Sequence, residues 1–281
     1  MNEHFFIYNN EFFRAGVPVI TVENRSFRYG EGLFETMRFR HGRIINLDLH
    51  FERLAEGMKV LGLGFPNFFS KNYFIDTVNE LLLKNSISEN ARIRLMMFAG
   101  DEALFRDTNQ PANFIIETFP LSSEMQLNKE GLAIDIFAGS RKSTDDFSNI
   151  KSNNYLPSVM AAKFALRNKL DDVVILNSFG RICESSIANV FIVKSEKIIT
   201  PPLSEGCVAG VMRRFLLEKL SLQQYTLDEN SLTTEDILAA DEVFLTNSIQ
   251  LLKWVKKFRN KTYGNEKVKE IFHFLLNQIE F

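Results

Sequence analysis

The spacing of apolar residues changes along the chain between two periods. Segments in which apolar and polar residues alternate, or in which apolar residues form short runs, predict strands, and apolar residues three and four positions apart predict amphipathic helices. The predicted strands cover residues 5–9, 12–16, 33–40, 43–47, 91–100, 113–119, 132–138, 171–178, 184–193 and 242–248. The predicted helices cover residues 48–63, 71–84, 155–168 and 211–220.

Turn formers and one polar tract divide this pattern. Asn9 with Asn10, and His41 with Gly42, predict the turns of two early hairpins. Residues 120–130 are polar and poor in apolar side chains, so we predict a linker there. Strands and helices mix on both sides of it. The sequence therefore predicts two α+β domains, residues 1–119 and residues 131–281.

Composition places the chain among globular proteins and narrows its partners. Of 281 residues, 45% are hydrophobic and 24% are charged, which is ordinary for folded domains. A formal net charge of −2 argues against nucleic acid or an anionic membrane as a partner. Cys183 and Cys207 lack metal-ligand spacing, so we expect free thiols and no metal site. With no basic start before an apolar run and no stretch of about 18 apolar residues, we expect a cytoplasmic protein.

Lys151 lies in a polar loop immediately before the helix predicted at 155–168. A lysine amine that is held neutral in such a place could attack a carbonyl and form a Schiff base. Taken alone the signal is weak, because most lysines are solvated surface charges. Neighbouring features must therefore decide whether Lys151 has a chemical role.

Glu184 falls in an apolar run, ICESSIANVFIV, that reads as a buried strand. A buried carboxylate needs a cationic or protonated partner. A protonated pyridine nitrogen would serve, and the pairing would keep a pyridine ring electron-poor for carbanion chemistry. An internal salt bridge to an arginine is the alternative, and from the residue alone it is the commoner case.

The helix predicted at 211–220 is preceded by Gly206 and Gly210. Exposed backbone N–H groups and the helix dipole could hold a phosphate there, and Arg53 could add a charge-assisted hydrogen bond. The glycine spacing matches neither a Walker loop nor a dinucleotide fingerprint. A plain helix entry and an exposed helix charge are the alternative interpretations of these residues.

The ordered set of blocks YGEGLFETMR, HFERL, IKSNNYLPSVMA, ESSIANVF, TPP with AGVMRRF, and EVFLTNS spans nearly the whole chain. In this order it resembles the fold type IV pyridoxal phosphate enzymes, the class IV aminotransferase family. That family comprises branched-chain aminotransferases, D-amino acid aminotransferases and aminodeoxychorismate lyases. The resemblance implies pyridoxal 5'-phosphate as cofactor, a smaller N-terminal domain, a larger strand-rich C-terminal domain, and a homodimer with its active site at the domain junction.

The resemblance also implies residue roles. Lys151 looks like the Schiff-base lysine that moves the proton at the substrate α-carbon, and Glu184 looks like the partner of the pyridine nitrogen. Tyr155 is similar to a tyrosine that binds the ring hydroxyl, although its spacing from Lys151 is one residue shorter than in branched-chain aminotransferases. The phosphate contacts would be Arg53, Val211, Met212 and Ser248, the ring face would lie on Val208, and the substrate pocket would contain Tyr29, Phe34, Thr36, Arg94 and Asn247.

Thr36 is the residue that separates activities within the family. GEGLFETMR resembles the lyase motif, where this threonine is thought to assist proton transfer, whereas branched-chain enzymes favour glycine there. A hydroxyl suits general acid work, although a β-branched residue also suits a strand. Arg94 could meet a substrate carboxylate, and Arg92 shares its strand face; either could instead be a solvent-facing charge.

We therefore predict a 4-amino-4-deoxychorismate lyase of folate synthesis, which releases pyruvate and 4-aminobenzoate from a small amino-carboxylate substrate. The alternative is a class IV aminotransferase that acts on branched-chain or D-amino acids. A ligand-binding protein that keeps the fold without catalysis is the non-enzymatic alternative, and intact Lys151 and Glu184 argue against it.

Overall fold

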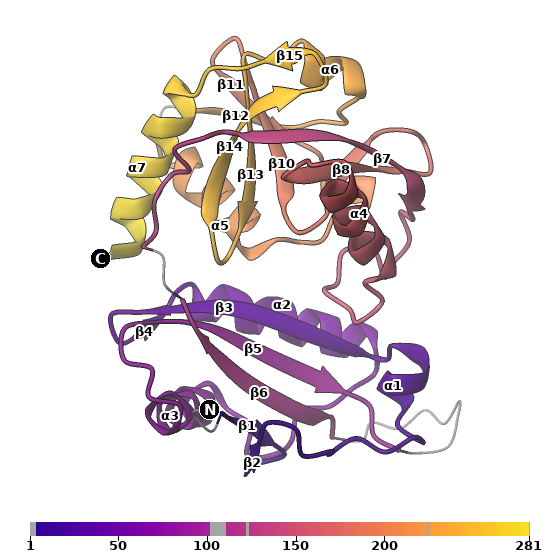
Figure 1. Cartoon of the computed structure of the whole chain (residues 1–281), viewed down its shortest axis with the longest axis vertical. Coiled ribbons are helices and arrows are strands. Elements are labelled where there is room, and N and C mark those ends of the chain that lie inside the picture. Colours follow the sequence, from indigo (N-terminus) through magenta and orange to yellow (C-terminus); the bar gives the residue numbers. More distant parts are fainter. Residues whose placement is uncertain (1–3, 102–110, 122–123, 224, 281) are drawn as a thin grey trace. The chain divides into compact units, whose positions relative to one another are not determined.

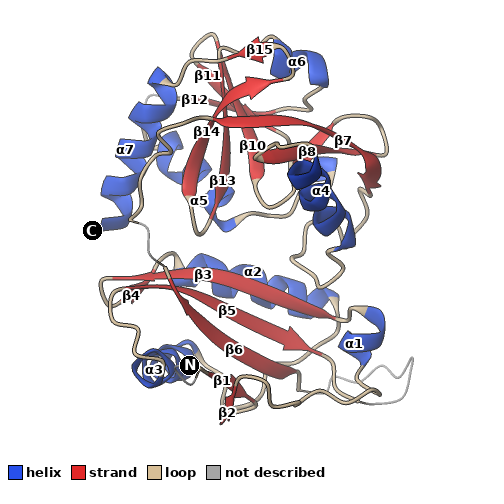
Figure 2. Cartoon of the chain, in the orientation of Figure 1, coloured by secondary structure: helices blue, strands red, loops and turns tan. Residues whose placement is uncertain are grey.

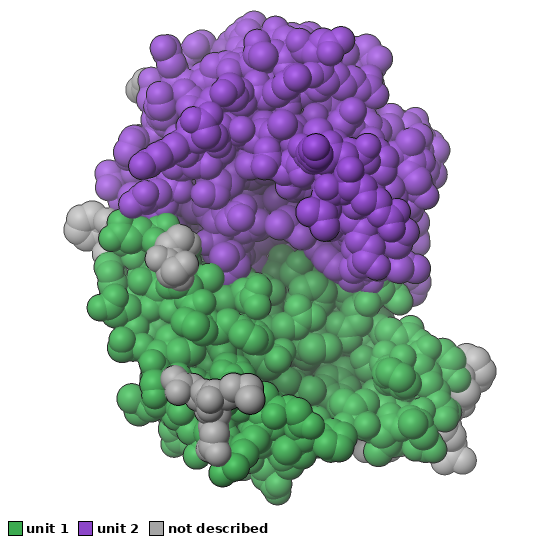
Figure 3. Space-filling model, viewed as in Figure 1, with its two compact units in different colours: residues 1–124, 150–154 green, residues 125–149, 155–281 purple. Residues whose placement is uncertain are grey.

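The computed structural model describes residues 4–101, 111–121, 124–223 and 225–280. The chain divides into two compact units, which Figure 3 colours separately. Unit 1 comprises residues 1–124 and 150–154, and unit 2 comprises residues 125–149 and 155–281. Both units mix strands and helices (Figure 2), so the predicted α+β class is confirmed.

Unit 1 contains a six-stranded antiparallel sheet with the strand order β2-β1-β6-β5-β3-β4 (Figure 1). Adjacent strands exchange backbone hydrogen bonds, and the longest pairing joins β3 to β5 over nine residue pairs, so β3 is well fixed along its length. The strands are β1 (Phe5–Tyr8), β2 (Glu11–Arg14), β3 (Gly32–Arg40), β4 (Arg43–Ile44), β5 (Asn90–Phe98) and β6 (Asn113–Pro120).

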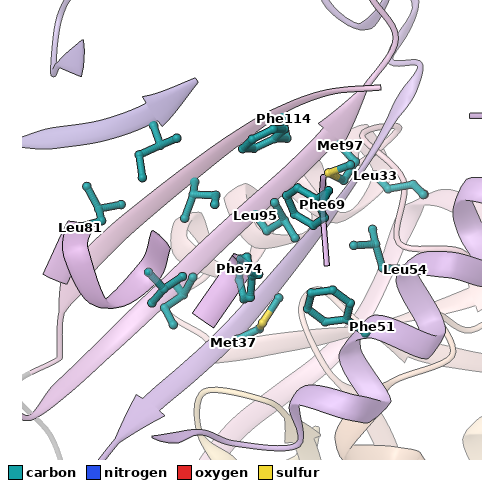
Figure 4. Close-up of a cluster of buried hydrophobic side chains, with 14 of the residues drawn as sticks. Leu33, Met37, Phe51, Leu54, Phe69, Phe74, Leu81, Leu95, Met97 and Phe114 are labelled. Carbon is teal, nitrogen blue, oxygen red and sulfur yellow. The ribbon is translucent and has the colours of Figure 1, made fainter. Parts of the chain in front are cut away.

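One face of this sheet carries the core of unit 1. Helices α2 (Leu47–Val60) and α3 (Lys71–Lys84) contact β3, β6 and β1, and they bury apolar side chains at helical spacing. The short helix α1 (Arg25–Tyr29) precedes β3. Figure 4 shows the apolar cluster that results; its labelled members are Leu33, Met37, Phe51, Leu54, Phe69, Phe74, Leu81, Leu95, Met97 and Phe114.

Residues 150–154 join unit 1 by pairing with the first part of β3, although the predicted domain boundaries grouped them with the second domain. The Phe34 N–H donates to the Lys151 carbonyl at 3.0 Å, and the Asn153 N–H donates to the Gly32 carbonyl at 2.9 Å. A Cβ on Gly32 would approach Asn153 Nδ2 to 2.6 Å. Gly32, the second glycine of the YGEG block, thus permits the close approach that sets Lys151 beside β3.

Unit 2 contains a nine-stranded mixed sheet with the order β12-β11-β10-β13-β14-β7-β8-β9, in which β15 also pairs with β14. The β14–β7, β7–β8 and β11–β12 pairs are parallel, and the others are antiparallel. The strands are β7 (Leu132–Lys142), β8 (Asp172–Asn177), β9 (Ile182–Ser185), β10 (Asn189–Lys194), β11 (Lys197–Thr200), β12 (Thr226–Glu229), β13 (Glu242–Asn247), β14 (Leu251–Phe258) and β15 (Lys261–Thr262).

Four α-helices pack on this sheet. Pro157 lies in the first turn of α4 (Leu156–Arg167), where its missing N–H costs no hydrogen bond. The N-cap of α5 (Val211–Ser221) is Gly210, and Thr233 with Asp236 forms a capping box at α6 (Thr234–Leu238). Helix α7 (Glu266–Glu280) contacts β13, β14 and α5. Among the described residues, no helix combines the length and apolarity that a membrane crossing requires.

The predicted hairpin turns are confirmed, because Asn9, Asn10, His41 and Gly42 all have positive φ between paired strands. The single strand predicted at 184–193 is wrong. Strand β9 ends at Ser185 and β10 begins at Asn189, because the Ser185 N–H donates to the Ala188 carbonyl and the Ala188 N–H donates to Ser185 Oγ. This local turn redirects the chain between two buried strands.

Candidate active site

In unit 1 the amine of Lys151 lies over an aromatic ring. Lys151 Nζ is 4.4 Å from the centroid of the Phe34 ring, and the Arg94 guanidinium is also 4.4 Å from it. In the β3–β5 register Thr36 lies opposite Arg94, two positions after Phe34. Because alternate residues of a strand share a face, the structure brings Lys151, Phe34, Thr36 and Arg94 to one face of the sheet.

Arg53 projects from α2 onto a carboxylate of β3. Its Nε donates to Glu35 Oε1 at 2.8 Å and its Nη2 donates to Glu35 Oε2 at 2.5 Å. His50, one turn earlier on the same helix, contacts Glu35 Oε2 through Nδ1 at 2.6 Å. The predicted alternative of an exposed helix charge is therefore wrong for Arg53, whose side chain is 10% exposed.

The electrostatics of this triad follow from its burial. Burial alone would raise the pKa of Glu35, but the charges of Arg53 and His50 and their hydrogen bonds lower the pKa to about 2. Burial lowers the pKa of His50, against the opposing effect of Glu35; Arg53 and Lys151 lower it further. We infer a neutral His50 that donates its Nδ1 proton to an ionised Glu35, so Arg53 is held by a fixed carboxylate.

In unit 2 the buried carboxylate of Glu184 on β9 accepts from two donors among the residues that the structure describes. The ammonium of Lys142, the last residue of β7, contacts Glu184 Oε1, and the Val208 N–H donates to Oε2 at 2.9 Å. Tyr155 lies near this group, and its hydroxyl donates to the Ser186 carbonyl at 3.3 Å. Burial raises the pKa of Tyr155, and the Glu184 charge raises it further. The predicted salt-bridge alternative for Glu184 thus exists, with a lysine in place of an arginine.

The entry to α5 is shaped for close approach. Gly210 has no side chain to cap the helix, and a Cβ there would come within 1.9 Å of Asn189 Oδ1. The first helical residues, Val211 and Met212, are buried. A helix start of this kind, without a side-chain cap, has the polarity and the donor groups that suit a phosphate.

The remaining predicted residues lie at element ends. Tyr29 closes α1 and is half exposed. Asn247 ends β13, and its Oδ1 accepts from the N–H groups of Ile249 and Gln250, so it stabilises a turn. Ser248 is the next residue of that turn.

Three residues of these groups were absent from the sequence prediction. Glu35 could have been found, because it lies in an apolar strand and a buried carboxylate needs a partner. His50 could have been found as the residue three positions before Arg53, on the same helix face. Lys142 gave no signal, because it stands in a polar segment, RKSTDD, where lysine is normally solvated.

The polar groups described above fit pyridoxal phosphate. Unit 1 offers an amine on an aromatic ring and a fixed guanidinium, and unit 2 offers a buried carboxylate, a tyrosine hydroxyl and a glycine-capped helix start. These groups match an aldehyde, a phosphate, a ring nitrogen and a ring hydroxyl in their chemistry.

The family model and the most similar relatives agree on one protein family. The model of the class IV amino-transferases matches residues 32–258. The chain is 30% identical to aminodeoxychorismate lyase from Bacillus subtilis over 263 residues, which cover 92% of this chain and 88% of the relative. It is 28% identical to a putative branched-chain-amino-acid aminotransferase from Methanocaldococcus jannaschii over 94% of this chain and 91% of that protein.

The fold has matches among solved structures. The branched-chain aminotransferase from Thermoproteus uzoniensis superposes with a TM-score of 0.89 at 24% identity, and the match covers 99% of this chain and 95% of that chain. At this identity the match shows the fold alone.

Proposed function

This chain belongs to the class IV aminotransferase family, and we propose that it is a 4-amino-4-deoxychorismate lyase that releases pyruvate and 4-aminobenzoate in folate synthesis. Enzymes of the family depend on pyridoxal phosphate. The observation that carries the proposal is the position of Thr36, whose side chain shares a sheet face with Phe34 and Arg94 and thus with the Lys151 amine.

The residues of unit 1 supply the proton transfers and the substrate contact. When bound, the cofactor supplies an electron sink for the carbanion at the amino-bearing carbon. Lys151 removes the proton from that carbon, and the Arg94 guanidinium binds a substrate carboxylate. The bond between the neighbouring ring carbon and the enolpyruvyl oxygen then breaks. The Thr36 hydroxyl donates the proton that the leaving oxygen needs. Glycine or alanine at position 36 has no hydroxyl and could not donate this proton.

The remaining predicted roles concern the binding of the cofactor and the substrate, and they stay proposals. Glu184 would pair with the ring nitrogen, Tyr155 with the ring hydroxyl, and Val208 would support the ring face. The phosphate would be held by the α5 start at Val211 and Met212, by Ser248 and by Arg53, whose guanidinium Glu35 orients. Tyr29, Phe34 and Asn247 would line the substrate pocket. The homodimer and the cytoplasmic location also stay predictions.

An aminotransferase acting on branched-chain or D-amino acids is the second candidate. It is favoured by the Methanocaldococcus jannaschii relative and by the shared nature of the cofactor residues, since both reactions begin with the same proton removal by Lys151. Only residues that act after that step can separate the two activities. Thr36 is such a residue, and Arg94 is not.

Product release from aminodeoxychorismate tests the proposal. Purified, cofactor-loaded protein should release pyruvate and 4-aminobenzoate with turnover, and Lys151→Ala should release neither. Thr36→Ser keeps the hydroxyl and should retain most activity, whereas Thr36→Val keeps the shape and should lower kcat by about 10²–10⁴-fold. Absence of release, together with amino transfer from L- or D-amino acids, would reject the lyase in favour of the aminotransferase.

A further inference from the structure

Lys142 is a partly buried lysine to which neither proposed reaction gives a role. It ends β7, where it lies opposite Asn177 of β8, and its side chain is 15% exposed. Its ammonium contacts Oε1 of Glu184, whose side chain is 7% exposed. Removing a lysine ammonium from water costs free energy, and the contact with the Glu184 carboxylate must offset that cost.

The carboxylate of Glu184 is held from two directions. Lys142 approaches Oε1 from β7, and the Val208 N–H donates to Oε2 from the segment before α5. A lysine ammonium is a point charge that occupies one lone-pair direction, and each carboxylate oxygen accepts more than one donor. The group therefore has a set orientation and retains acceptor capacity for a further donor.

The two thiols and the tyrosine hydroxyl around Lys142 are neutral near pH 7. Burial raises the pKa of Cys207 to about 12, and burial also raises the pKa values of Cys183 and Tyr155. For Lys142 itself burial acts to lower the pKa, but the charge of Glu184 outweighs it and the pKa is raised. Lys142 and Glu184 are thus the paired charges of this cluster, and the charges of Arg213, Glu205 and Asp172 act on its thiols and its tyrosine hydroxyl from outside the pair.

We propose that Lys142 is a positioning residue that keeps Glu184 ionised, so that the proton shared with the cofactor's ring nitrogen resides on that nitrogen. The inference rests on the role proposed above for Glu184. Lys142 touches the carboxylate, so it stabilises the ionised carboxyl more strongly than it disfavours a proton on a nitrogen further away. Without the ammonium, burial favours a neutral carboxyl, which would keep the proton and leave the ring nitrogen unprotonated.

The test reads the proton on the ring nitrogen directly. The protein is loaded with cofactor labelled with ¹⁵N in the ring, and the ¹⁵N chemical shift is measured by NMR across about pH 6 to 9. The wild-type shift should be that of a protonated pyridine throughout. Lys142→Arg, which keeps the charge, should match it. Lys142→Gln, which keeps a donor for Oε1 and removes the charge, should move the shift to that of an unprotonated pyridine.

The variants separate failure of this inference from failure of the proposed role of Glu184. If Lys142→Gln keeps the wild-type shift while Glu184→Gln loses it, Lys142 does not set the proton position and the inference is wrong. If Glu184→Gln also keeps the wild-type shift, Glu184 is not the ring partner and the premise falls with the inference. A wild-type ring nitrogen that is unprotonated overturns the inference without any variant, even if Lys142→Gln does not fold.

Discussion

Glu35 of unit 1 and Glu184 of unit 2 are both buried carboxylates on apolar strands, yet their partners differ. Both oxygens of Glu35 are occupied by the Arg53 fork, and His50 adds a further contact. Glu184 has one ammonium and one backbone N–H. A guanidinium fork saturates and fixes a carboxylate, whereas a lysine neutralises it and leaves room for another donor. We infer that Glu35 serves to hold Arg53 and that Glu184 serves to receive a ligand.

Removing the charge of Glu35 should have the largest of the predicted effects, and it should lower the stability of the protein. Glu35→Gln leaves Arg53 as a largely buried guanidinium without its anion, so the free energy of unfolding should fall by about 3–5 kcal/mol. Urea denaturation measures it. Glu56→Gln, at an exposed position of α2, the helix that carries Arg53, is the matched control and should change stability by less than about 0.5 kcal/mol. Equal effects of the two variants would show that the triad contributes nothing special.

Lowering the pH should remove the stabilising contribution of the Glu35 carboxylate in the wild type. The folded-state pKa of Glu35 is about 2, below its usual value of 4.5, so its contribution is present above about pH 4.5 and is lost as the pH falls towards 2. The shift corresponds to about 3 kcal/mol. Urea denaturation as a function of pH should show this loss in the wild type beyond that of Glu35→Gln. Parallel pH profiles of the two proteins would contradict the lowered pKa.

The Glu184 side of the comparison depends on close packing before α5. In Gly210→Ala the new Cβ would overlap Asn189 Oδ1, and Asn189 Nδ2 in turn donates to the Val208 carbonyl at 3.0 Å. Overpacking of about 1–3 kcal/mol should weaken the affinity for pyridoxal phosphate by about tenfold or more. A fluorescence titration measures the affinity. Gly264→Ala, which meets no atom within 4 Å, should bind the cofactor as the wild type does.

The smallest effect should come from the ring beneath Lys151. Phe34→Leu keeps an apolar side chain but removes the aromatic face that Lys151 and Arg94 share. Loss of about 0.5–1 kcal/mol should lower kcat/KM by roughly two- to fivefold. Phe27→Leu, at a ring that is 73% exposed, serves as control. An unchanged kcat/KM in Phe34→Leu would mean that the ring does not position either cation.

The sequence predicted the elements whose signal is local. Helix α3 was found at residues 71–84 because its apolar positions repeat every three or four residues, and the two hairpins were found because only certain residues accept positive φ. The break between β9 and β10 was missed because ESSIANVFIV reads as one apolar strand and its turn depends on a serine side chain. Helix α7 was not predicted, although Val268, Ile271, Phe272 and Leu275 have helical spacing.

For the candidate site, the sequence identified residues by resemblance but could not supply their partners. Pairing between residues 150–154 and β3 joins segments more than 110 positions apart, and no local pattern encodes it. The contact of Lys142 with Glu184 is likewise tertiary. A carboxylate in an apolar strand indicates that a cationic partner is needed, but only the tertiary structure determines which residue supplies it.

Chemical mapping of the cofactor-bound lysine tests the central claim most directly. The loaded protein is reduced with borohydride, which fixes the cofactor to its lysine, and the labelled peptide is identified by mass spectrometry. We predict the label on Lys151. Lys142, whose raised pKa keeps it protonated and poorly nucleophilic, should carry none. A label on Lys142, or on no lysine, would contradict the account.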